Sequence, residues 1–139
     1  MLFRSIYLDA FSSFYSHPYH LATKEALTLT KNSLNENGIL ITNIISSIYG
    51  DTGKFLRAEL KTLKEVFPQV YIFPIQNPGD GAKIQNIMIV ALKTPQELTP
   101  SDKYKDFLKN LWQAEIPEDL PTLTDEFAPV DQYVFEMLK

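Results

Sequence analysis

Apolar and polar positions alternate along the chain in blocks that predict strands and helices in turn. Apolar runs of strand length stand at Ser5–Asp9, Gly38–Ile45, Val70–Ile75 and Asn86–Leu92. Two stretches with one apolar face at helical spacing, Thr23–Leu34 and Lys54–Phe67, separate the first three runs. The β-α-β-α-β-β pattern predicts one α/β domain over residues 1–139, whose first two strands are buried in the sheet.

The expected helix ends rest on capping and breaking residues. Thr23 is a favourable N-cap, and Glu25 stands in the first turn, where the helix dipole favours an acid. We expect Asn35–Gly38 to end this helix, with Gly38 at positive φ. In the second helix four apolar side chains are expected to face the core: Leu56, Leu60, Leu63 and Phe67. Five polar side chains are expected to face water: Arg57, Glu59, Lys61, Lys64 and Glu65.

One proline orders the strands. Pro74 lacks an N–H group and cannot donate to a neighbouring strand, so we expect the third run to lie at a sheet edge. The fourth run contains no breaker, and we place it antiparallel between the second and third. Asn77–Gly81 joins the third and fourth runs and predicts a hairpin turn. Because a strand and not a helix follows these glycines, a phosphate-binding loop is disfavoured.

The C-terminal part is predicted to be less regular. Thr99–Asp102 has the pattern of a helix start, and we assign the apolar side chains that follow to the core: Tyr104, Phe107, Leu108, Leu111 and Trp112. Ile116–Thr124 contains two prolines and predicts an extended segment. A short helix is expected to open at Pro129.

The composition of the chain argues against several classes of protein. The chain has 139 residues, is 45% hydrophobic and contains no Cys, which excludes disulfides and thiolate chemistry. No apolar run approaches the ~20 residues that span a bilayer, so we expect a cytoplasmic protein without a membrane partner. Seven of the 17 acids fall in Glu115–Lys139, which we interpret as a solvated acidic tail over 115–139. No basic stripe is present, and we expect no nucleic-acid partner.

Asp9 is the leading candidate for a functional residue. Ligands of open α/β sheets bind beyond the carboxyl ends of the strands, and Asp9 ends the first predicted strand. Its carboxylate could bind a cationic amine or take a proton from it; alternatively, it caps the following loop through local hydrogen bonds. Only four residues precede this strand, where a glycine-rich cofactor loop would normally lie upstream. We therefore expect the chain to correspond to the second half of a cofactor-binding domain.

Other polar residues carry weaker hypotheses. The spacing of His17 and His20 could suit a metal, but no third ligand accompanies them, and we predict no metal site. Ser46 and Ser47 follow the second strand and could line the same crevice as Asp9, although no His is placed to activate them. Three tail residues could imitate paired catalytic carboxylates, although solvation is the favoured interpretation: Asp125, Glu126 and Asp131.

Several segments together resemble one known family. These are Tyr7–Ser13, His17–Leu27, Leu34–Leu40, Leu60–Val70 and Leu123–Asp131. They are similar to the C-terminal half of spermidine synthase-like proteins, which have the class I S-adenosylmethionine-dependent methyltransferase fold. The resemblance implies a Rossmann-like sheet ordered 3-2-1-4-5-7-6, of which this chain supplies four strands in the order 4-5-7-6, the last antiparallel.

The resemblance also implies site residues and a cofactor. Asp9 matches the first carboxylate of the Asp-Ser-Ser-Asp pattern of aminopropyl transferases, whereas Ser12 occupies the position of the second. Ser12, Tyr19 and His20 are then expected to line a substrate pocket. The family's glycine-rich loop and ribose-binding acid have no counterpart here. We therefore expect no cofactor to be held by this chain alone, and S-adenosylmethionine or its decarboxylated form is implied only by resemblance.

Three hypotheses for function remain open. The chain is a methyl- or aminopropyl-transferase segment that needs a complementary half, a non-catalytic oligomeric or partner-binding domain with the same fold, or an unrelated small α/β enzyme. The expected partner is a second copy of the chain or a chain that supplies the N-terminal half. In either case the unpaired edge of the first strand is the expected contact.

Overall fold

A computed structural model gives the fold, and it describes residues 1–11, 18–97, 101–102 and 105–139. Four strands form one mixed sheet: β1 (Phe3–Phe11), β2 (Leu34–Ser46), β3 (Gln69–Pro74) and β4 (Gln85–Leu92). The helices are α1 (Lys24–Asn32), α2 (Lys54–Val66), α3 (Lys105–Leu108) and α4 (Val130–Phe135), with 3-10 turns at Tyr19–Leu21, Asp51–Gly53 and Glu136–Leu138. None of the helices in the described residues is long and apolar enough to cross a membrane.

The strand order is the predicted one. The sheet runs β1-β2-β4-β3, with β1 parallel to β2 and the other two pairs antiparallel. Pro74 lies on β3 at the edge of the sheet, as its missing N–H requires. Beyond this edge, the backbone N–H of Trp112 donates to the carbonyl of Ile72 at 2.9 Å, and the side-chain amide of Asn110 donates to the carbonyl of Pro74 at 3.2 Å. The loop that follows α3 therefore covers the edge of β3.

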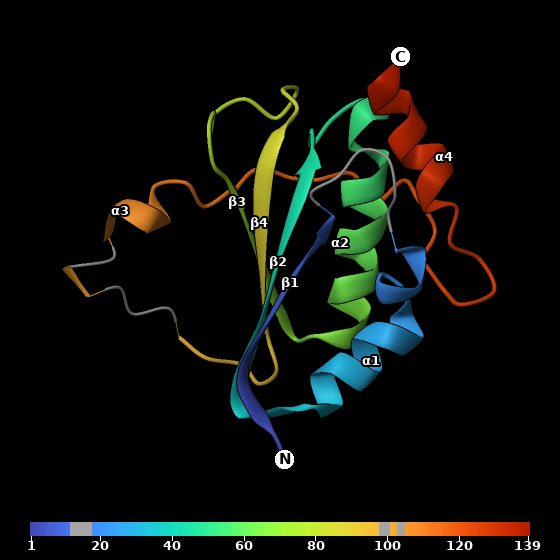
Figure 1. Ribbon diagram of the computed structural model, residues 1–139. Helices are drawn as coiled ribbons and strands as arrows, with labels where there is room; N and C mark the ends of the chain where they lie inside the picture. The colour runs from blue at the N-terminus through green and yellow to red at the C-terminus, as the bar shows by residue number, and fades with distance from the viewer. Residues whose placement is uncertain (12–17, 98–100, 103–104) are drawn as a thin grey trace.

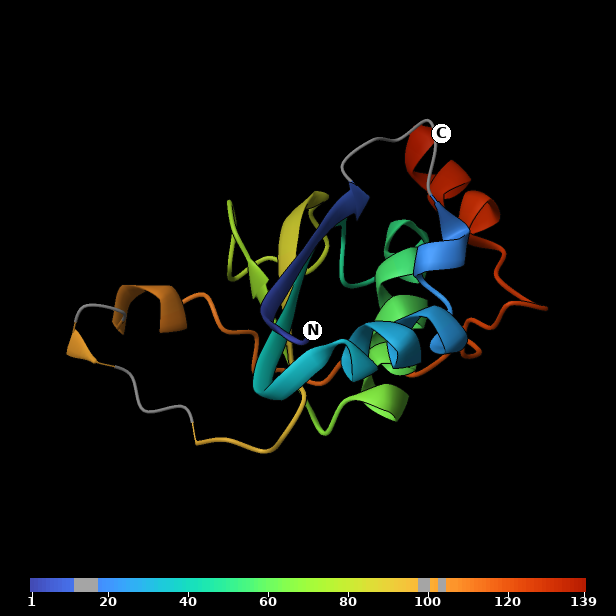
Figure 2. The same ribbon diagram turned by 60° about the horizontal axis from the view of Figure 1, so that its bottom comes forward.

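The helices α1, α2 and α4 lie on one side of the sheet, as Figures 1 and 2 show. On β2 the side chains alternate between the two faces: Leu40, Thr42 and Ile44 are buried under the helices, whereas Ile41 and Asn43 are half-buried on the opposite face. The expectation that this strand is buried on both faces is wrong. The helices in the described residues cover one face, and the opposite one, called here the open face, stays partly accessible.

The first strand also departs from expectation. The residues of β1 are not buried: Ile6 and Leu8 are half-buried on the helix side, whereas Ser5, Tyr7 and Asp9 are exposed on the open face. The reason is topological, since β1 is an edge strand with β2 as its neighbour. An edge strand on a sheet covered from one side cannot bury both of its faces.

The start of α1 agrees with the prediction, but its end does not. Thr23 is the N-cap, and its hydroxyl accepts from the Ala26 N–H at 3.3 Å. The helix ends at Asn32, and β2 already begins at Leu34, whose side chain is fully buried. Gly38 lies within β2 without positive φ, so its predicted role in ending the helix is wrong. Burial of Leu34 in the core outweighs the turn propensity of the residues that follow it.

The C-terminal segment wraps the outer side of α2. Leu123 is fully buried; its N–H donates to the Thr62 hydroxyl at 2.9 Å, and its carbonyl accepts from the Lys24 N–H at 2.8 Å. The short helix after Pro129 is present as α4. In the preceding region α3 spans only Lys105–Leu108, and Phe107 is 71% exposed, so its assignment to the core is wrong. The proposed helix start at 99–100 and Tyr104 lie outside the described residues.

Candidate functional site at the carboxyl ends of β1 and β2

Asp9 lies near the carboxyl end of β1, where a small irregularity changes the strand. Leu8 pairs with Thr42 and Phe11 with Ile44, so β1 contains one residue more than β2 over this interval. Such bulges bend a strand and re-aim its side chains. Asp9 is exposed, and its carboxylate makes no hydrogen bond or ion pair with the described part of the chain. The structure therefore presents a carboxylate to solvent at the edge where ligands of parallel strands bind.

Asn43 on β2 accompanies Asp9 on the open face. It follows Thr42, the partner of Leu8, and its side chain lies on the side away from the helices. The Asn43 amide donates to the Asn86 side chain on β4 at 3.1 Å, while its own Oδ1 is buried without a partner in the described structure. A carboxylate and an unused amide acceptor on one face suit a group with several N–H donors, such as an ammonium ion.

Asn43 was not among the site residues expected from the sequence. The sequence contains the signal, because Thr42 and Asn43 are the polar residues of a mostly apolar run over 38–45, and Asn43 is its one amide side chain. A polar side chain in such a run either meets a partner or serves a ligand. The Asn43 side chain meets a partner, Asn86, through its nitrogen, and its oxygen has no partner among the described residues.

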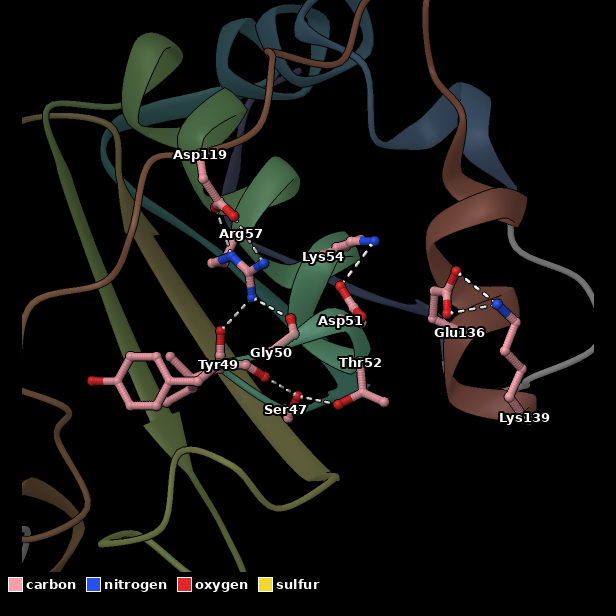
Figure 3. Close-up of polar contacts among 11 residues, drawn as sticks. Ser47, Tyr49, Gly50, Asp51, Thr52, Lys54, Arg57, Asp119, Glu136 and Lys139 are labelled. Carbon is pink, nitrogen blue, oxygen red and sulfur yellow. Dashed lines mark hydrogen bonds and ion pairs between the residues drawn. The ribbon is translucent and has the colours of Figure 1, made fainter.

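Ser46 and Ser47 serve the loop that follows β2. Both are fully buried. The Ser46 hydroxyl donates to the carbonyl of Thr52 at 3.2 Å, and the Ser47 hydroxyl donates to that of Tyr49 at 2.8 Å. The hydroxyls of Ser47 and Thr52 also lie 2.7 Å apart (Figure 3). These two serines hold the loop together, and neither is presented to solvent beside Asp9.

Arg57 fastens the same loop from α2. Its guanidinium donates to the carbonyls of Ile48 at 2.9 Å and Gly50 at 2.8 Å. It also forms a bidentate salt bridge with the Asp119 carboxylate, with N–O distances of 2.7 and 3.0 Å (Figure 3). The Arg57 side chain is 5% exposed, so the expectation that it faces water is wrong. The guanidinium beside Asp119 lowers the pKa of that carboxyl below its usual range. One arginine thus ties the loop after β2 to the C-terminal segment.

Two glycines allow this tight loop. Gly50 has a φ of 74°, in the left-handed region that side chains rarely adopt. A Cβ on Gly53 would lie 2.6 Å from the carbonyl oxygen of Ile48 and 2.7 Å from the Arg57 guanidinium. Any side chain at Gly53 would therefore push against the contacts that hold the loop.

Tyr19 and His20 lie together, apart from Asp9. Both are exposed on the 3-10 turn before α1, with their rings edge to face and their centroids 5.8 Å apart. They line a shallow hollow with Glu25 and Asp125, and Asp9 is not among its lining residues. The Asp125 N–H donates to Glu25 at 3.0 Å, and its carboxylate accepts from the Thr23 hydroxyl at 2.6 Å. Asp125 is therefore a capping partner of α1 and not one of a catalytic pair.

Two of the predicted residues fall outside this description. Ser12 and His17 lie in the stretch 12–17, which the structure does not describe. The substrate-binding roles assigned to Ser12, Tyr19 and His20 remain predictions. Over the described ranges, no cluster of three or more His, Cys, Asp or Glu side chains could hold a metal ion.

Glu59 is the most unusual titratable group of the domain. It stands on α2 and is completely buried, and neither carboxyl oxygen has a hydrogen-bond partner in the described structure. Burial raises its pKa well above the usual range. The expectation that Glu59 faces water is wrong, because α2 is enclosed by the sheet on one side and by α1, α4 and the C-terminal segment on the others (Figure 2).

The fold corresponds to part of a methyltransferase-like fold, with a four-stranded sheet flanked by helices. A crystal structure of a probable spermidine synthase from Corynebacterium glutamicum ATCC 13032 superposes with a TM-score of 0.59 at 19% identity. That superposition covers 82% of this chain and 39% of the other. A polyamine aminopropyltransferase from Vibrio vulnificus (strain CMCP6) is 29% identical over 141 residues, which cover 91% of this chain. No family model matches the sequence.

These comparisons confirm the resemblance stated from the motifs: the chain is similar to part of a spermidine synthase-like protein. It spans 44% of the length of the Vibrio relative, less than half.

Proposed function

We propose that this chain provides the amine-binding side of a spermidine synthase-like transferase site. The observation that carries the proposal is the Asp9 carboxylate, exposed and without a partner in the described residues at the carboxyl end of β1. The free Oδ1 of Asn43 lies on the same face. The similarity to a polyamine aminopropyltransferase supports an amine as the ligand class.

The chemistry follows from the charges. A primary amine is protonated at neutral pH, and its cation is held by a carboxylate and neutral acceptors. Before it can act as a nucleophile it must lose a proton, which a carboxylate within hydrogen-bond reach can accept. In this proposal the Asp9 carboxylate serves both roles. With Ser12 at the second position of the family's pattern, the site offers one carboxylate and not two. We therefore propose that it accepts one ammonium group.

The same residues do not fit the implied cofactor on their own. In the described part of this edge, the Asp9 carboxylate and the buried Asn43 Oδ1 are without a partner on the open face, and the Thr42 hydroxyl is without one under the helices. Ser46 and Ser47 are used within their loop. A carboxylate and an amide suit one ammonium group, but they are too few for the base, ribose and amino-acid part of S-adenosylmethionine. We propose that these 139 residues alone hold neither S-adenosylmethionine nor its decarboxylated form and do not catalyse transfer.

Titration with a diamine tests the amine site directly. Adding 1,4-diaminobutane to the isotope-labelled chain should shift the NMR signals of Asp9 and Asn43, and Asp9→Asn should abolish the shift. Asp131→Asn removes an exposed carboxylate from α4 and is the matched control. Equal shifts in Asp9→Asn and the unmodified chain would remove Asp9 from the site.

Calorimetry tests the cofactor statement separately. We expect no binding of S-adenosylmethionine at micromolar concentrations. A dissociation constant near ~10 µM, about −7 kcal/mol, would contradict the proposal that a complementary half is needed.

The second candidate is a non-catalytic oligomeric or partner-binding domain with the same fold. The serine at position 12, where the family's pattern has its second carboxylate, favours it. The diamine titration separates the two candidates, because a domain without an amine site would show no shift at Asp9.

A further inference from the structure

The first turn of chain within β2 is irregular. Between the first two residue pairs that β1 makes with β2, β1 contains one residue and β2 contains four, residues 35–38. The pairing of β2 with β4 begins only at Ile39. Residues 35–38 therefore lie outside both registers, and we call them the β2 bulge. The bulge lies at the amino end of β2, at the bottom of the sheet in Figure 1.

The residues that follow β4 hold the main chain of the β2 bulge. The Lys93 N–H donates to the Gly38 carbonyl at 3.1 Å, and the Thr94 hydroxyl donates to the Glu36 carbonyl at 2.7 Å. The side chain of Asn37 differs from its surroundings, because it is exposed and makes no hydrogen bond with the described residues. The bulge thus fastens its main chain and leaves one amide side chain in water.

Gly38, which follows Asn37, is required by the packing of the bulge. A Cβ at Gly38 would lie 2.8 Å from the Cβ of Leu34 and 3.0 Å from the carbonyl oxygen of Asn35. Leu34 is fully buried, and a close-packed core gives it little room to move aside. The fold therefore keeps an asparagine-glycine pair in an exposed stretch outside the strand ladders.

We propose that Asn37 is a site of spontaneous deamidation, with water as the co-reactant. The backbone nitrogen of Gly38 attacks Cγ of Asn37. A C–N bond forms, the Cγ–Nδ2 bond breaks, and ammonia leaves with the proton of the Gly38 N–H. Water then opens the resulting cyclic imide at either of its two carbonyls, which gives aspartate or isoaspartate. The net change is one water taken up and one ammonia released, without an oxidant or a reductant.

Two features of the β2 bulge favour ring closure at this asparagine. Glycine has no Cβ beside its N–H, so the approach of that nitrogen to the amide carbon is open. Ladder hydrogen bonds do not hold the bulge in one extended conformation. Other asparagines lack these features. Asn43 and Asn86 lie within the ladder between β2 and β4 and bond to each other, and Asn77 precedes a proline, which has no N–H.

The products change the bulge in two ways. Both add a negative charge, and isoaspartate also lengthens the main chain by one methylene group. The added carbon lies between the two bulge carbonyls that Lys93 and Thr94 hold, so these contacts should weaken. Asn37 and Asn43 stand toward opposite ends of β2. This inference therefore goes beyond the proposed amine site and does not depend on it.

Mass spectrometry of the full chain tests the proposal. Incubation in mildly alkaline buffer should give a species heavier by about 1 Da, and peptide mapping should place the change at Asn37. Asn37→Asp supplies the reference for the aspartate product, and Asn37→Ser should remove the heavier species. Asn32 is the control within the chain, since it is exposed but followed by Ser33. It should convert at least about tenfold more slowly.

The same incubation in urea shows whether the folded bulge leaves Asn37 free to react. We expect conversion in the folded chain within about tenfold of the rate in the unfolded chain, with faster amide exchange at Lys93 in the isoaspartate fraction. Conversion in urea without conversion in the folded chain overturns the proposal, because the bulge then holds Asn37 rigidly. Conversion of Asn32 ahead of Asn37 overturns it as well. Binding of a diamine at Asp9 is read separately, so failure of one proposal leaves the other standing.

Discussion

Replacing Glu59 should stabilise the domain. The carboxyl is completely buried, and neither oxygen finds a partner in the described structure. A buried polar group left unsatisfied costs about 1–3 kcal/mol of stability. Methionine has a similar volume and no group that needs a partner. We expect Glu59→Met to raise the free energy of unfolding by about 1–3 kcal/mol at pH 7.

The gain should depend on pH with a definite sign. Burial raises the pKa of Glu59 in the folded chain, so the folded state keeps a proton that the unfolded state loses as pH rises. Its contribution to stability is fully present below the ordinary carboxyl pKa and is lost as pH rises toward the raised value. The advantage of Glu59→Met should therefore be largest at neutral pH and smaller near pH 4.

Urea unfolding followed by circular dichroism, at several pH values from 4 to 8, measures both effects. Glu59→Gln separates them, because it removes the titration but keeps a buried polar group. Glu65→Gln is the control on the same helix, since Glu65 is exposed and bonded to Thr122 and Lys24, which lower its pKa. If Glu59→Met destabilises the chain at every pH, the carboxyl has a partner and the reasoning fails.

Two further predictions concern the contact between α2 and the C-terminal segment. Asp119→Ala leaves the Arg57 guanidinium buried without a counter-charge, and we expect urea unfolding to show a free energy of unfolding lower by about 3 kcal/mol. This value is at the low end for buried pairs because the Asp119 side chain is 49% exposed. Asp51→Ala breaks an exposed pair with Lys54, and we expect a much smaller loss of unfolding free energy than in Asp119→Ala. Equal losses in the two variants would contradict the role of burial. Because the pKa of Asp119 is lowered in the folded chain, its carboxylate contributes stability above the ordinary carboxyl pKa, and this contribution is lost as pH falls. The free energy of unfolding of Asp119→Asn should therefore change less between pH 6 and pH 3 than that of the unmodified chain.

The strand order was predictable because it follows from local chemistry. Pro74 cannot take part in a ladder on both sides, and this alone places β3 at an edge. The Thr23 cap is equally local, since its hydroxyl and the Ala26 N–H are three residues apart. Such features need no knowledge of the rest of the chain.

The site was only partly predictable. Strand ends identify Asp9, but the place of Asn43 beside it depends on the pairing of β1 with β2 and on which face the helices cover. Helical periodicity likewise identifies the apolar face of α2, but it does not show whether another segment packs on the polar side of the helix. Arg57 was expected to face water because its partner Asp119 lies some 60 residues further along the chain. Glu59 was expected to face water because the packing of α1 and α4 against α2 cannot be read from the sequence of α2.

The polar face of α2 is better understood as a binding surface for the C-terminal segment. Along this helix Arg57 meets Asp119, Lys64 lies 3.7 Å from Glu118, and the Thr62 hydroxyl accepts the Leu123 N–H. The excess of acids after residue 115, expected to be solvated, therefore includes partners for the bases of α2. This pairing explains why one helix can carry charges on its outer side and still be enclosed. Glu59 differs from the other charged side chains of this helix, because it is completely buried. Among the described residues no hydrogen-bond partner reaches its carboxyl, and burial raises its pKa well above the usual range.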